Sequence, residues 1–440
     1  MIAMKFGGSS LGSRERIARC VELVLQERER RPAVVVSACG RTTDRLLAAA
    51  EAALEGRIDC GEICDFHAAL LEQLGLRVPE VDHLLRELGT LLTGVSLTRE
   101  LTARTRDLVM SFGERISARI FAAALHGAGL EAEPCDAFAI GLVTDSIHGG
   151  ASPLDESYGA IRSSLARRAA VPVITGFLGA DASGSVTTLG RSGSDYSASI
   201  VAAAIGAAEV QIWTDVDGVM TCDPSLDARA ENLPLLSFDE ASELAYFGAE
   251  VLHPSTLVPA IRRGIPVRVI NTTSPGDPGT KIVAEPVLTH RVAKSVVYKE
   301  GVDLVLLGSP RLTSSVKLLA SALEITCRHG VGIHMATTSE ATVSLVTASD
   351  CDASRLDAAL ADLAGLGRVE IRRGKAIVCV VGAELVDNPA ALGAIFGAIS
   401  AAGIRAEMVS QSAAAINVGF LVDDSEIAPA VTALHGLLLE

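Results

Sequence analysis

The chain has 440 residues, of which 49% are apolar, 21% are charged and only 3% are aromatic. This length predicts about two to four domains, and the composition excludes a disordered chain and indicates aliphatic cores. The 38 basic and 53 acidic residues give a net charge of −15, which disfavours nucleic acid and anionic membrane surfaces as partners.

Strand-like and helical runs alternate along the chain as far as Lys281, which predicts a layered α/β domain. The expected strands are Met1–Phe6, Ala33–Ser37, Val171–Thr175, Val210–Trp213 and Pro266–Ile270. The expected helices are Arg14–Arg30, a long helical region over Leu46–Leu101, Ser111–Leu125, Tyr196–Ala207, Phe238–Tyr246 and Pro254–Arg263. The turn-rich segment Thr272–Gly279 marks the end of this pattern and is the expected domain boundary.

The rest of the sequence contains two copies of a β-α-β-β-α pattern that repeat at roughly 74 residues. The first copy has expected strands Val302–Leu307, Gly332–Thr337 and Thr342–Thr347 and expected helices Ser314–His329 and Ser354–Leu366. The second has expected strands Ala376–Val381, Ile404–Ser410 and Ile416–Val422 and expected helices Pro389–Ala402 and Glu426–Leu438. We therefore expect a domain over residues 1–285 and two accessory modules over 296–367 and 368–440.

Nine cysteines are scattered through the chain without paired spacings. Cys60, Cys64 and His67 form the tightest group, but their spacing matches no common metal site, so we expect buried thiols in a reducing compartment and no metal. The N-terminus carries no long apolar run of the secretory kind, and no apolar run approaches the roughly 20 residues of a membrane span. The sequence therefore predicts a soluble, cytoplasmic protein.

Lys5-Phe6-Gly7-Gly8-Ser9-Ser10 lies at the first junction between a strand and a helix. Glycines there allow backbone N–H groups to approach an anion, and the following helix N-terminus and Lys5 add positive potential. A tight turn explains Gly-Gly equally well. The segment is not a Walker A motif, because no Gly-Lys-Ser/Thr follows at the required spacing.

A second glycine-rich segment, Thr187–Asp195 (TTLGRSGSD), runs into the helix expected from Tyr196. The Arg191 guanidinium matches carboxylates, and the N–H groups of a helix N-terminus favour anions. An Asp that caps the helix beside a surface Arg explains the same residues as well.

Two acidic positions complete the candidate set. Thr214-Asp215 follows an expected strand, and ligands bind at strand carboxyl ends in open α/β sheets. Glu114 opens an expected helix, where an acidic residue commonly does no more than complement the helix dipole.

Together these elements resemble the aspartokinases, within the wider amino-acid kinase family. Lys5–Ser10 is similar to that family's KFGGTS signature, with Ser9 in place of Thr. The other matching motifs, in the family's order, are SFGER (Ser111–Arg115), TGFLG (Thr175–Gly179), TTLGRSGSDYSA (Thr187–Ala198), IWTDVDGV (Ile212–Val219) and LAYFGAEVLHPSTL (Leu244–Leu257). The loop Cys39–Asp44 fits the substrate loop, and the terminal repeats resemble paired ACT modules. The resemblance covers essentially the whole chain and implies a kinase domain with a mainly parallel central sheet, followed by two βαββαβ-type ACT modules.

The resemblance implies transfer of the γ-phosphoryl group of ATP to the β-carboxylate of L-aspartate, the first step toward lysine, threonine and methionine. A carboxylate needs no deprotonation at neutral pH, so the site must mainly align the reactants and neutralise charge. Mg²⁺ is implied as the companion of ATP and needs few protein ligands.

The resemblance also implies a role for each candidate residue. The phosphate is held by Lys5, Gly7, Gly8 and Ser9, and Asp195 orients the site or assists Mg²⁺. Aspartate is bound through its carboxylate by Arg191, through its ammonium by Glu114, and further by Ser37, Thr43 and Ser194. The nucleotide is contacted by Thr214 and Asp215, with Met220, Ser225 and Glu250 nearby.

Three of these positions depart from the family's nucleotide pattern. Met220 replaces a Tyr, Ser225 replaces an Arg and Glu250 replaces a Lys, while Ser192 replaces a Gly in the segment before Ser194. The loss of two cations and the gain of one anion beside a triphosphate should weaken nucleotide binding.

ACT modules of this family bind lysine or threonine, and the expected effector site lies in the first repeat. Its candidate residues are Ile333, His334, Ser339 and Glu340, beside the loop Ser309–Lys317. His334 stands where an Asp is frequent, so we expect weak or altered inhibition. The repeats also predict a homodimer joined through residues beyond about Val292, and an interface without any effector is the alternative.

Two other functions stay open at this point. The chain could phosphorylate another acid, such as glutamate. It could also be a catalytically silent, effector-binding paralogue that regulates a partner subunit, as the altered nucleotide positions suggest.

Overall fold

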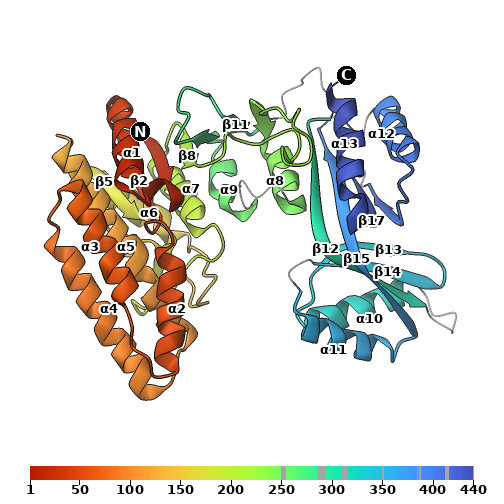
Figure 1. The fold of residues 1–440 in the computed structure, drawn as a ribbon, viewed down its shortest axis with the longest axis horizontal. Helices are drawn as coiled ribbons and strands as arrows, with labels where there is room; N and C mark the ends of the chain where they lie inside the picture. Colours follow the sequence, from red (N-terminus) through yellow and green to blue (C-terminus); the bar gives the residue numbers. More distant parts are fainter. Residues whose placement is uncertain are drawn as a thin grey trace. The chain divides into compact units, whose positions relative to one another are not determined.

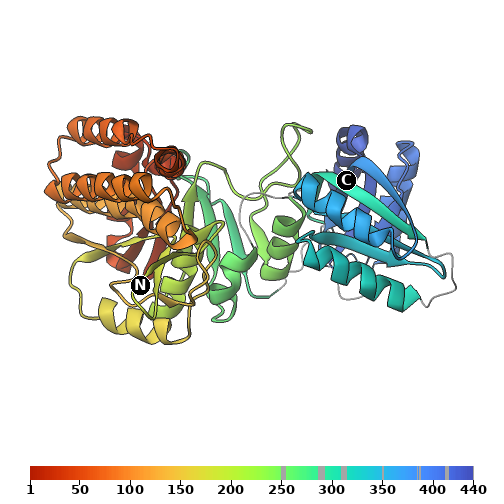
Figure 2. The same cartoon turned by 90° about the horizontal axis from the view of Figure 1, so that it is seen from below.

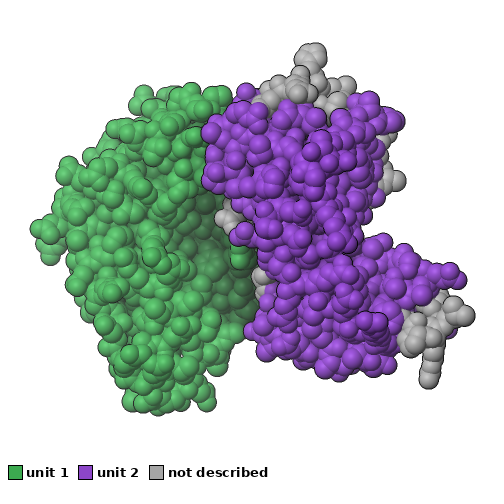
Figure 3. Space-filling model, turned by 45° about the vertical axis from the view of Figure 1, so that its right-hand side comes forward, with its two compact units in different colours: residues 1–219, 232–241, 251–287 green, residues 220–231, 242–250, 288–440 purple. Residues whose placement is uncertain are grey.

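The computed structural model describes residues 1–248, 254–285, 293–308, 315–348, 351–383, 385, 388–411 and 416–439. The chain forms two compact units (Figure 3). The first contains residues 1–219, 232–241 and 251–287, and the second contains residues 220–231, 242–250 and 288–440. No helix in the described ranges is long and apolar enough to cross a membrane.

The first unit is built on an eight-stranded, mainly parallel sheet (Figure 1). Its strand order is β3 (Ala132–Cys135), β5 (Val171–Thr175), β2 (Pro32–Val36), β1 (Ile2–Phe6), β8 (Val210–Thr214), β10 (Val267–Asn271), β11 (Thr280–Val283) and β9 (Leu235–Ser237). Only the β10–β11 pair is antiparallel. Every residue of β1 and β2 is buried, because helices cover both faces of a parallel sheet.

Successive residues of β1 point to opposite faces of this sheet and so meet different helices. Ile2, Met4 and Phe6 join a core with residues of α1 (Arg14–Gln26), α2 (Thr42–Leu54), α4 (Pro79–Thr98) and α5 (Ala103–Gly127). Helix α7 (Gly193–Ile205) packs on β1 and β2, and α6 (Glu156–Leu165) and α9 (Pro254–Ile261) pack against α7. The central strand therefore presents Lys5 toward α7.

The helical part of the first unit differs from the expectation. The region expected to be helical over Leu46–Leu101 is three helices, because α3 (Gly61–Leu74) lies between α2 and α4. Gly75, in the left-handed conformation with φ of 68°, ends α3, and Pro79 begins α4. Helix α5 starts at Ala103, well before the expected Ser111.

Several short elements carried too little pattern to be predicted. A three-stranded sheet consists of β4 (Val143–Thr144), β6 (Leu178–Asp181) and β7 (Val186–Thr188). The turn-rich segment Thr272–Gly279 joins β10 to its antiparallel neighbour β11 within the first unit. Helix α8 (Phe238–Phe247) begins in the first unit and continues into the second.

The second unit contains the two expected β-α-β-β-α repeats, which share one six-stranded sheet. Its strand order is β13 (Ile333–Thr338), β14 (Thr342–Thr347), β12 (Ser295–Gly308), β15 (Arg368–Val381), β17 (Asn417–Asp423) and β16 (Met408–Ser410). The helices of the two repeats are α10 (Ser315–Arg328), α11 (Ala353–Leu363), α12 (Pro389–Ala401) and α13 (Ile427–Leu439). Helices α10 and α11 lie side by side, as do α12 and α13 (Figure 2).

The central strands β12 and β15 are much longer than expected. The predicted strands Val302–Leu307 and Ala376–Val381 are only their second halves, and the strand predicted over Ile404–Ser410 is confined to Met408–Ser410. The two long strands pair along their whole length, with register shifts near Gly301. Each repeat therefore completes its half of the sheet with a strand segment from the other repeat.

Gly279 lies in the connection between β10 and β11, where the backbone of β10 comes very close to it. Its φ is +62°, and an added Cβ would lie 1.9 Å from the Val269 carbonyl oxygen. Gly264 has the same φ of +62° but no neighbour within 4 Å of the added Cβ. We expect Gly264→Ala to cost about 1–2 kcal/mol of stability through backbone strain alone, and Gly279→Ala to cost clearly more. Thermal unfolding of both variants measures the difference, and equal shifts in Tm would contradict this packing.

Candidate functional site

The carboxyl ends of the parallel strands meet at one edge of the eight-stranded sheet. Backbone hydrogen bonds continue the ladder into the loops that follow: Gly7 N donates to Trp213 O (3.2 Å), Ser37 N to Phe6 O (3.1 Å), Gly176 N to Val36 O (2.9 Å) and Thr272 N to Thr214 O (2.8 Å). The loops after β1, β2, β5, β8 and β10 are thus held side by side. Sequence positions from 7 to 272 reach one site in this way.

The first glycine-rich loop packs directly on the loop after β2. A Cβ added to Gly8 would lie 2.8 Å from Ala38 O and 3.0 Å from Gly40 O, so a side chain at Gly8 would push the two loops apart. Gly40 N donates to Gly8 O at 2.8 Å. Arg16 Nη1 donates to the Ser9 carbonyl at 2.7 Å, which holds the short 3₁₀ turn Ser9–Leu11 against α1. The glycine is required here by the close approach of two backbones.

A buried ion pair joins the end of β1 to the start of α7. Lys5 Nζ lies 2.6 Å from Asp195 Oδ1, and each side chain is only 11% exposed. Asp195 is in the first turn of α7, but the helix has no side-chain cap, so the capping interpretation of this segment is wrong. A charge in this position is tolerated because its partner is in contact.

Glu114 lies in the middle of α5 and is 3% exposed, so it is not the first-turn dipole partner that the sequence allowed. Its Oε1 accepts a hydrogen bond from Ala38 N at 3.2 Å, whereas Oε2 has no hydrogen-bond partner within the described part of the chain. Burial raises the pKa of Glu114 from 4.5 to about 8. At neutral pH this carboxyl group therefore keeps its proton, and a cation that arrives with a ligand would favour its ionised form.

The Arg191 segment turns sharply before α7. Arg191 is exposed, and its guanidinium makes no hydrogen bond or ion pair with any described residue. Ser192 adopts a left-handed φ of +52°. Ser194 is buried against the loop after β5, because a Cβ on Gly176 would lie 2.6 Å from its Oγ. The segment therefore presents a free cation beside the buried ion pair.

The remaining substrate candidates lie on the loop after β2 and on α2. Ser37 directly follows β2 and is half-buried. Thr43 is half-buried in the first turn of α2, next to Thr42, whose Oγ1 donates to Cys39 O at 2.6 Å. Both lie close in sequence to Ala38, whose backbone N–H donates to Glu114.

The candidate nucleotide residues are divided between the two units. Thr214 and Asp215 stand at the end of β8, where Thr214 Oγ1 donates to Asp215 Oδ1 at 3.2 Å. Met220 belongs to the second unit, and its carbonyl accepts from Ser295 Oγ at 2.9 Å. Ser225 also belongs to the second unit, and its N and Oγ donate to Asp223 Oδ1 at 2.8 and 2.7 Å. Glu250 lies outside the described residues.

The effector candidates lie on and just after β13. Ile333 and His334 are half-buried, and Ser339 and Glu340 are exposed. His334 Nδ1 forms a hydrogen bond with the Tyr246 hydroxyl at 3.1 Å. Most of the neighbouring Ser309–Lys317 loop lies outside the described residues. The partner of His334 is therefore Tyr246 on α8, a contact that the sequence did not predict.

Within the described ranges no group of three or more His, Cys, Asp and Glu residues could hold a metal ion. Cys60 and Cys64 have their sulfur atoms 3.9 Å apart, and His67 is buried with Nδ1 bonded to Ile63 O at 2.7 Å. All nine cysteines are free thiols. Asp107, a buried carboxylate on α5, was missed, because its only signal in the sequence is its position seven residues before Glu114.

Comparison with known proteins places this geometry in a family. Residues 1–271 match the amino acid kinase family, and residues 378–438 match an ACT domain. Aspartokinase 1, chloroplastic, of Arabidopsis thaliana is 38% identical over 455 residues, which cover 99% of this chain and 80% of that protein. The crystal structure of E. coli aspartokinase III in complex with aspartate and ADP has a TM-score of 0.82 and 29% identity, with 100% of both chains covered. The complex of the same protein with lysine and aspartate has a TM-score of 0.79 and 30% identity, again with 100% of both chains covered.

The raised pKa of Glu114 predicts a pH-dependent penalty on stability. From pH 4.5 to about 8 the unfolded chain loses this proton while the folded protein keeps it, so stability falls as pH rises through this window. Glu114→Gln removes the penalty, and we expect its Tm to exceed that of the wild type at pH 8.5 and to match it near pH 5. One pKa unit corresponds to about 1.4 kcal/mol, so the gain should reach a few kcal/mol.

Glu209→Gln is the matched control, because Glu209 is a buried carboxylate that pairs with two arginines. Burial acts to raise its pKa, but hydrogen bonds from Arg268 Nε and Arg30 Nη2, both 2.8 Å, outweigh burial and lower it. This substitution should therefore lower the Tm at pH 8.5. A lower Tm for Glu114→Gln at pH 8.5 would contradict the account, because it would show that the partners of Glu114 outweigh the cost of its burial.

Proposed function

This chain belongs to the amino acid kinase family and within it is an aspartokinase, which phosphorylates L-aspartate with ATP, and we propose that the transfer takes place around Lys5 and Asp195. The observation that carries this proposal is their buried ion pair at the edge where five strand ends meet. A cation in such a site is placed to meet the charge of a transferring phosphoryl group.

The reaction forms a bond between a β-carboxylate oxygen of aspartate and the γ-phosphorus of ATP, and it breaks the bond from that phosphorus to the leaving oxygen of ADP. No proton has to be removed, because the acceptor is already a carboxylate at neutral pH. The chain's task is to align the two anions and to balance their charge. Lys5 balances the charge, and Asp195 holds Lys5 in place. The N–H groups of Gly8 and Ser9 face the phosphate, and Gly7, whose own N–H donates to Trp213 O, shapes the loop that presents them.

Glu114 and Arg191 are proposed to bind the two ends of aspartate. The ammonium group pairs with Glu114 Oε2, which otherwise lacks a partner, and its charge favours the ionised carboxylate. The free guanidinium of Arg191 binds the α-carboxylate in its planar fork. Ser37, Thr43 and Ser194 complete the pocket.

ATP is proposed to lie along the strand ends at Thr214 and Asp215, and its Mg²⁺ to enter with the phosphates. Mg²⁺ usually keeps several waters and takes one or two carboxylates, and Asp195 is the buried carboxylate that fits this need. When bound, the ion supplies further neutralisation of phosphate charge. We propose that Met220, Ser225 and Glu250 lower the affinity of the site for ATP.

The second unit is proposed to be regulatory and to join two copies of the chain. The structure of E. coli aspartokinase III in complex with lysine and aspartate supports lysine as the effector, with threonine as the alternative. We place the effector at Ile333, His334, Ser339 and Glu340 and the homodimer contact beyond residue 292. The free thiols support a reducing compartment, and we propose the cytoplasm.

Replacement of Lys5 tests the proposed centre. We expect Lys5→Ala to lower kcat about 10²-fold, the usual loss when one charge-stabilising group is removed. The substitution also leaves Asp195 buried without its partner, so stability must be measured beside activity. The double variant Lys5→Met/Asp195→Asn removes both charges, and it should recover stability without recovering kcat.

Lys281→Ala is the control, because Lys281 is the other lysine of the first unit and lies on β11. This variant should keep the wild-type kcat. Near-normal turnover of Lys5→Ala at full aspartate and ATP would contradict the assignment of the centre.

Lysine titration of the activity tests the regulatory proposal. We expect weak inhibition of the wild type, because the His334 imidazole is a poor partner for an ammonium group. His334→Asp should tighten inhibition, whereas His334→Asn, which adds no charge, should not. Strong inhibition of the unmodified enzyme would contradict the weakened site, and a monomer in sedimentation would contradict the interface.

A further inference from the structure

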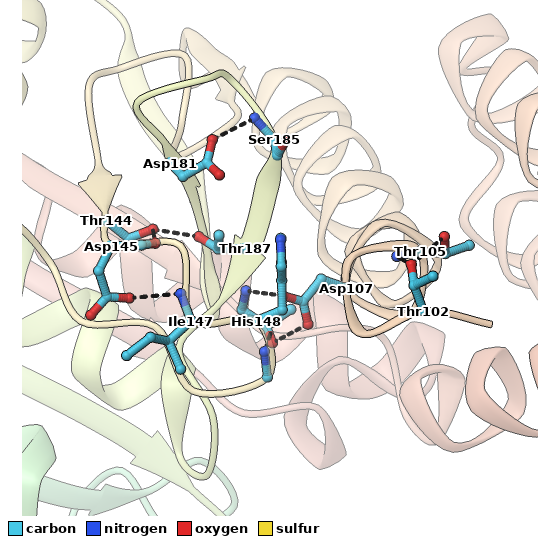
Figure 4. A network of polar contacts seen from close by, with 12 residues as sticks. Thr102, Thr105, Asp107, Thr144, Asp145, Ile147, His148, Asp181, Ser185 and Thr187 are labelled. Carbon is cyan, nitrogen blue, oxygen red and sulfur yellow. Dashed lines mark hydrogen bonds and ion pairs between the residues drawn. The ribbon is translucent and has the colours of Figure 1, made fainter.

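Asp107 is a buried carboxylate that the proposed mechanism does not use. It lies on α5 and is 1% exposed. Its Oδ2 accepts hydrogen bonds from His148 Nδ1 (2.8 Å), Gly149 N (3.1 Å) and Thr188 N (3.2 Å), and its Oδ1 accepts one from Thr188 Oγ1 (2.7 Å). Figure 4 shows Asp107 facing His148 from the helix. Four donors satisfy both oxygens of this buried carboxyl group.

All four donors come from two segments that meet beside Arg191. Thr188 ends β7, and the chain runs from it through Leu189 and Gly190 to Arg191. Ala151 N donates to Thr188 O at 2.9 Å, which joins the loop after β4 to the same strand end. Gly190 has a φ of +76°, and an added Cβ would lie 3.3 Å from the Gly149 carbonyl oxygen. The base of the Arg191 segment is therefore packed against a loop that Asp107 holds.

The loop after β4 is itself closed by hydrogen bonds. Asp145 Oδ1 accepts from Ile147 N at 3.1 Å and from Ser152 N at 3.2 Å. The Thr144 and Thr187 hydroxyls form a hydrogen bond with their oxygens 2.7 Å apart, and Figure 4 shows the two side chains facing each other. These hydrogen bonds make the loop rigid, so a shift of α5 would also shift the end of β7.

The same helix also carries Glu114. Glu114 is seven positions after Asp107, which is two helical turns and a total rise of about 10.5 Å. Both side chains therefore lie on the same face of α5. Asp107 thus fixes the segment of Arg191, and Glu114 fixes the loop of Ala38, from a single rigid element.

We propose that Asp107, with His148, is a positioning residue that sets the distance between Glu114 and Arg191. This inference rests on the proposed function, in which these two groups bind the opposite ends of aspartate. Asp107 touches neither aspartate nor ATP. It acts through the strand end and loop that place the Arg191 guanidinium, and so it selects the length of the amino acid that fits.

Asp107→Asn tests the inference through the Michaelis constants. The amide keeps the shape of the side chain but offers an N–H group to donors that need an acceptor. We expect the KM for aspartate to rise about tenfold or more, since small displacements of a binding group have large effects. The KM for ATP should stay within about twofold. The control is Glu209→Gln, a buried carboxylate held by Arg30 and Arg268, which should destabilise the fold without splitting the two constants.

His148 variants keep the test decisive if Asp107→Asn fails to fold, because the His148 side chain is partly exposed, at 16%. His148→Leu removes the donor and should raise the KM for aspartate. His148→Asn restores an N–H donor near the position of Nδ1 and should return the KM toward the wild-type value. Equal, wild-type constants for both His148 variants, or parallel changes in the two KM values, would overturn the positioning role.

Arg191→Lys distinguishes a failure of the proposed function from a failure of the positioning role of Asp107. A rise only in the KM for ATP would show that Arg191 belongs to the nucleotide side and would overturn the proposed function. A rise in the KM for aspartate in Arg191→Lys, without one in Asp107→Asn and His148→Leu, would keep the proposed function and overturn the positioning role.

Discussion

The ion pair between Lys5 and Asp195 is the interaction on which the site depends. Both side chains are almost fully buried, so each charge is stable only while the other is in contact. This requirement fixes the start of α7 against the end of β1. Because the neighbouring strands are parallel, the loops after β2, β5, β8 and β10 are brought to the same place. The ion pair thus lies at a sheet edge whose loops come from distant parts of the sequence.

The carboxylates on α5 show two opposite uses of burial. Asp107 has four donors and holds structure, whereas Glu114 has one and leaves an oxygen without a partner among the described residues. The first stabilises the folded chain and the second costs stability, as its raised pKa indicates. Such a cost is expected where a ligand completes the site, because strain and unsatisfied groups gather at functional positions.

Sequence patterns were sufficient wherever a single local signal decided the structure. The strand Val171–Thr175 is confirmed to the residue, because a fully buried parallel strand is a continuous apolar run. The first halves of β12 and β15 were missed, because Lys299-Glu300-Gly301 and Arg372-Arg373-Gly374 have the composition of turns. In the structure Gly301 and Gly374 adopt positive φ inside long strands.

The candidate site divides in the same way. The motifs around Lys5, Glu114 and Arg191 were recognisable because each has a characteristic local spacing. The contact of Asp107 with His148 spans 41 residues and has no local spacing, so only the folded chain reveals it. The helix interior at Glu114 was misjudged for a related reason, since α5 begins in a stretch without an apolar pattern.

Hydroxylamine trapping of the acyl phosphate measures the central claim most directly. The wild-type enzyme is incubated with ATP and Mg²⁺ and either aspartate or glutamate, and the hydroxamate formed is quantified. Our account predicts aspartyl hydroxamate at a steady rate and little or none from glutamate, because Glu114 and Arg191 stand at a fixed separation. No hydroxamate from aspartate, or equal amounts from both acids, would contradict it.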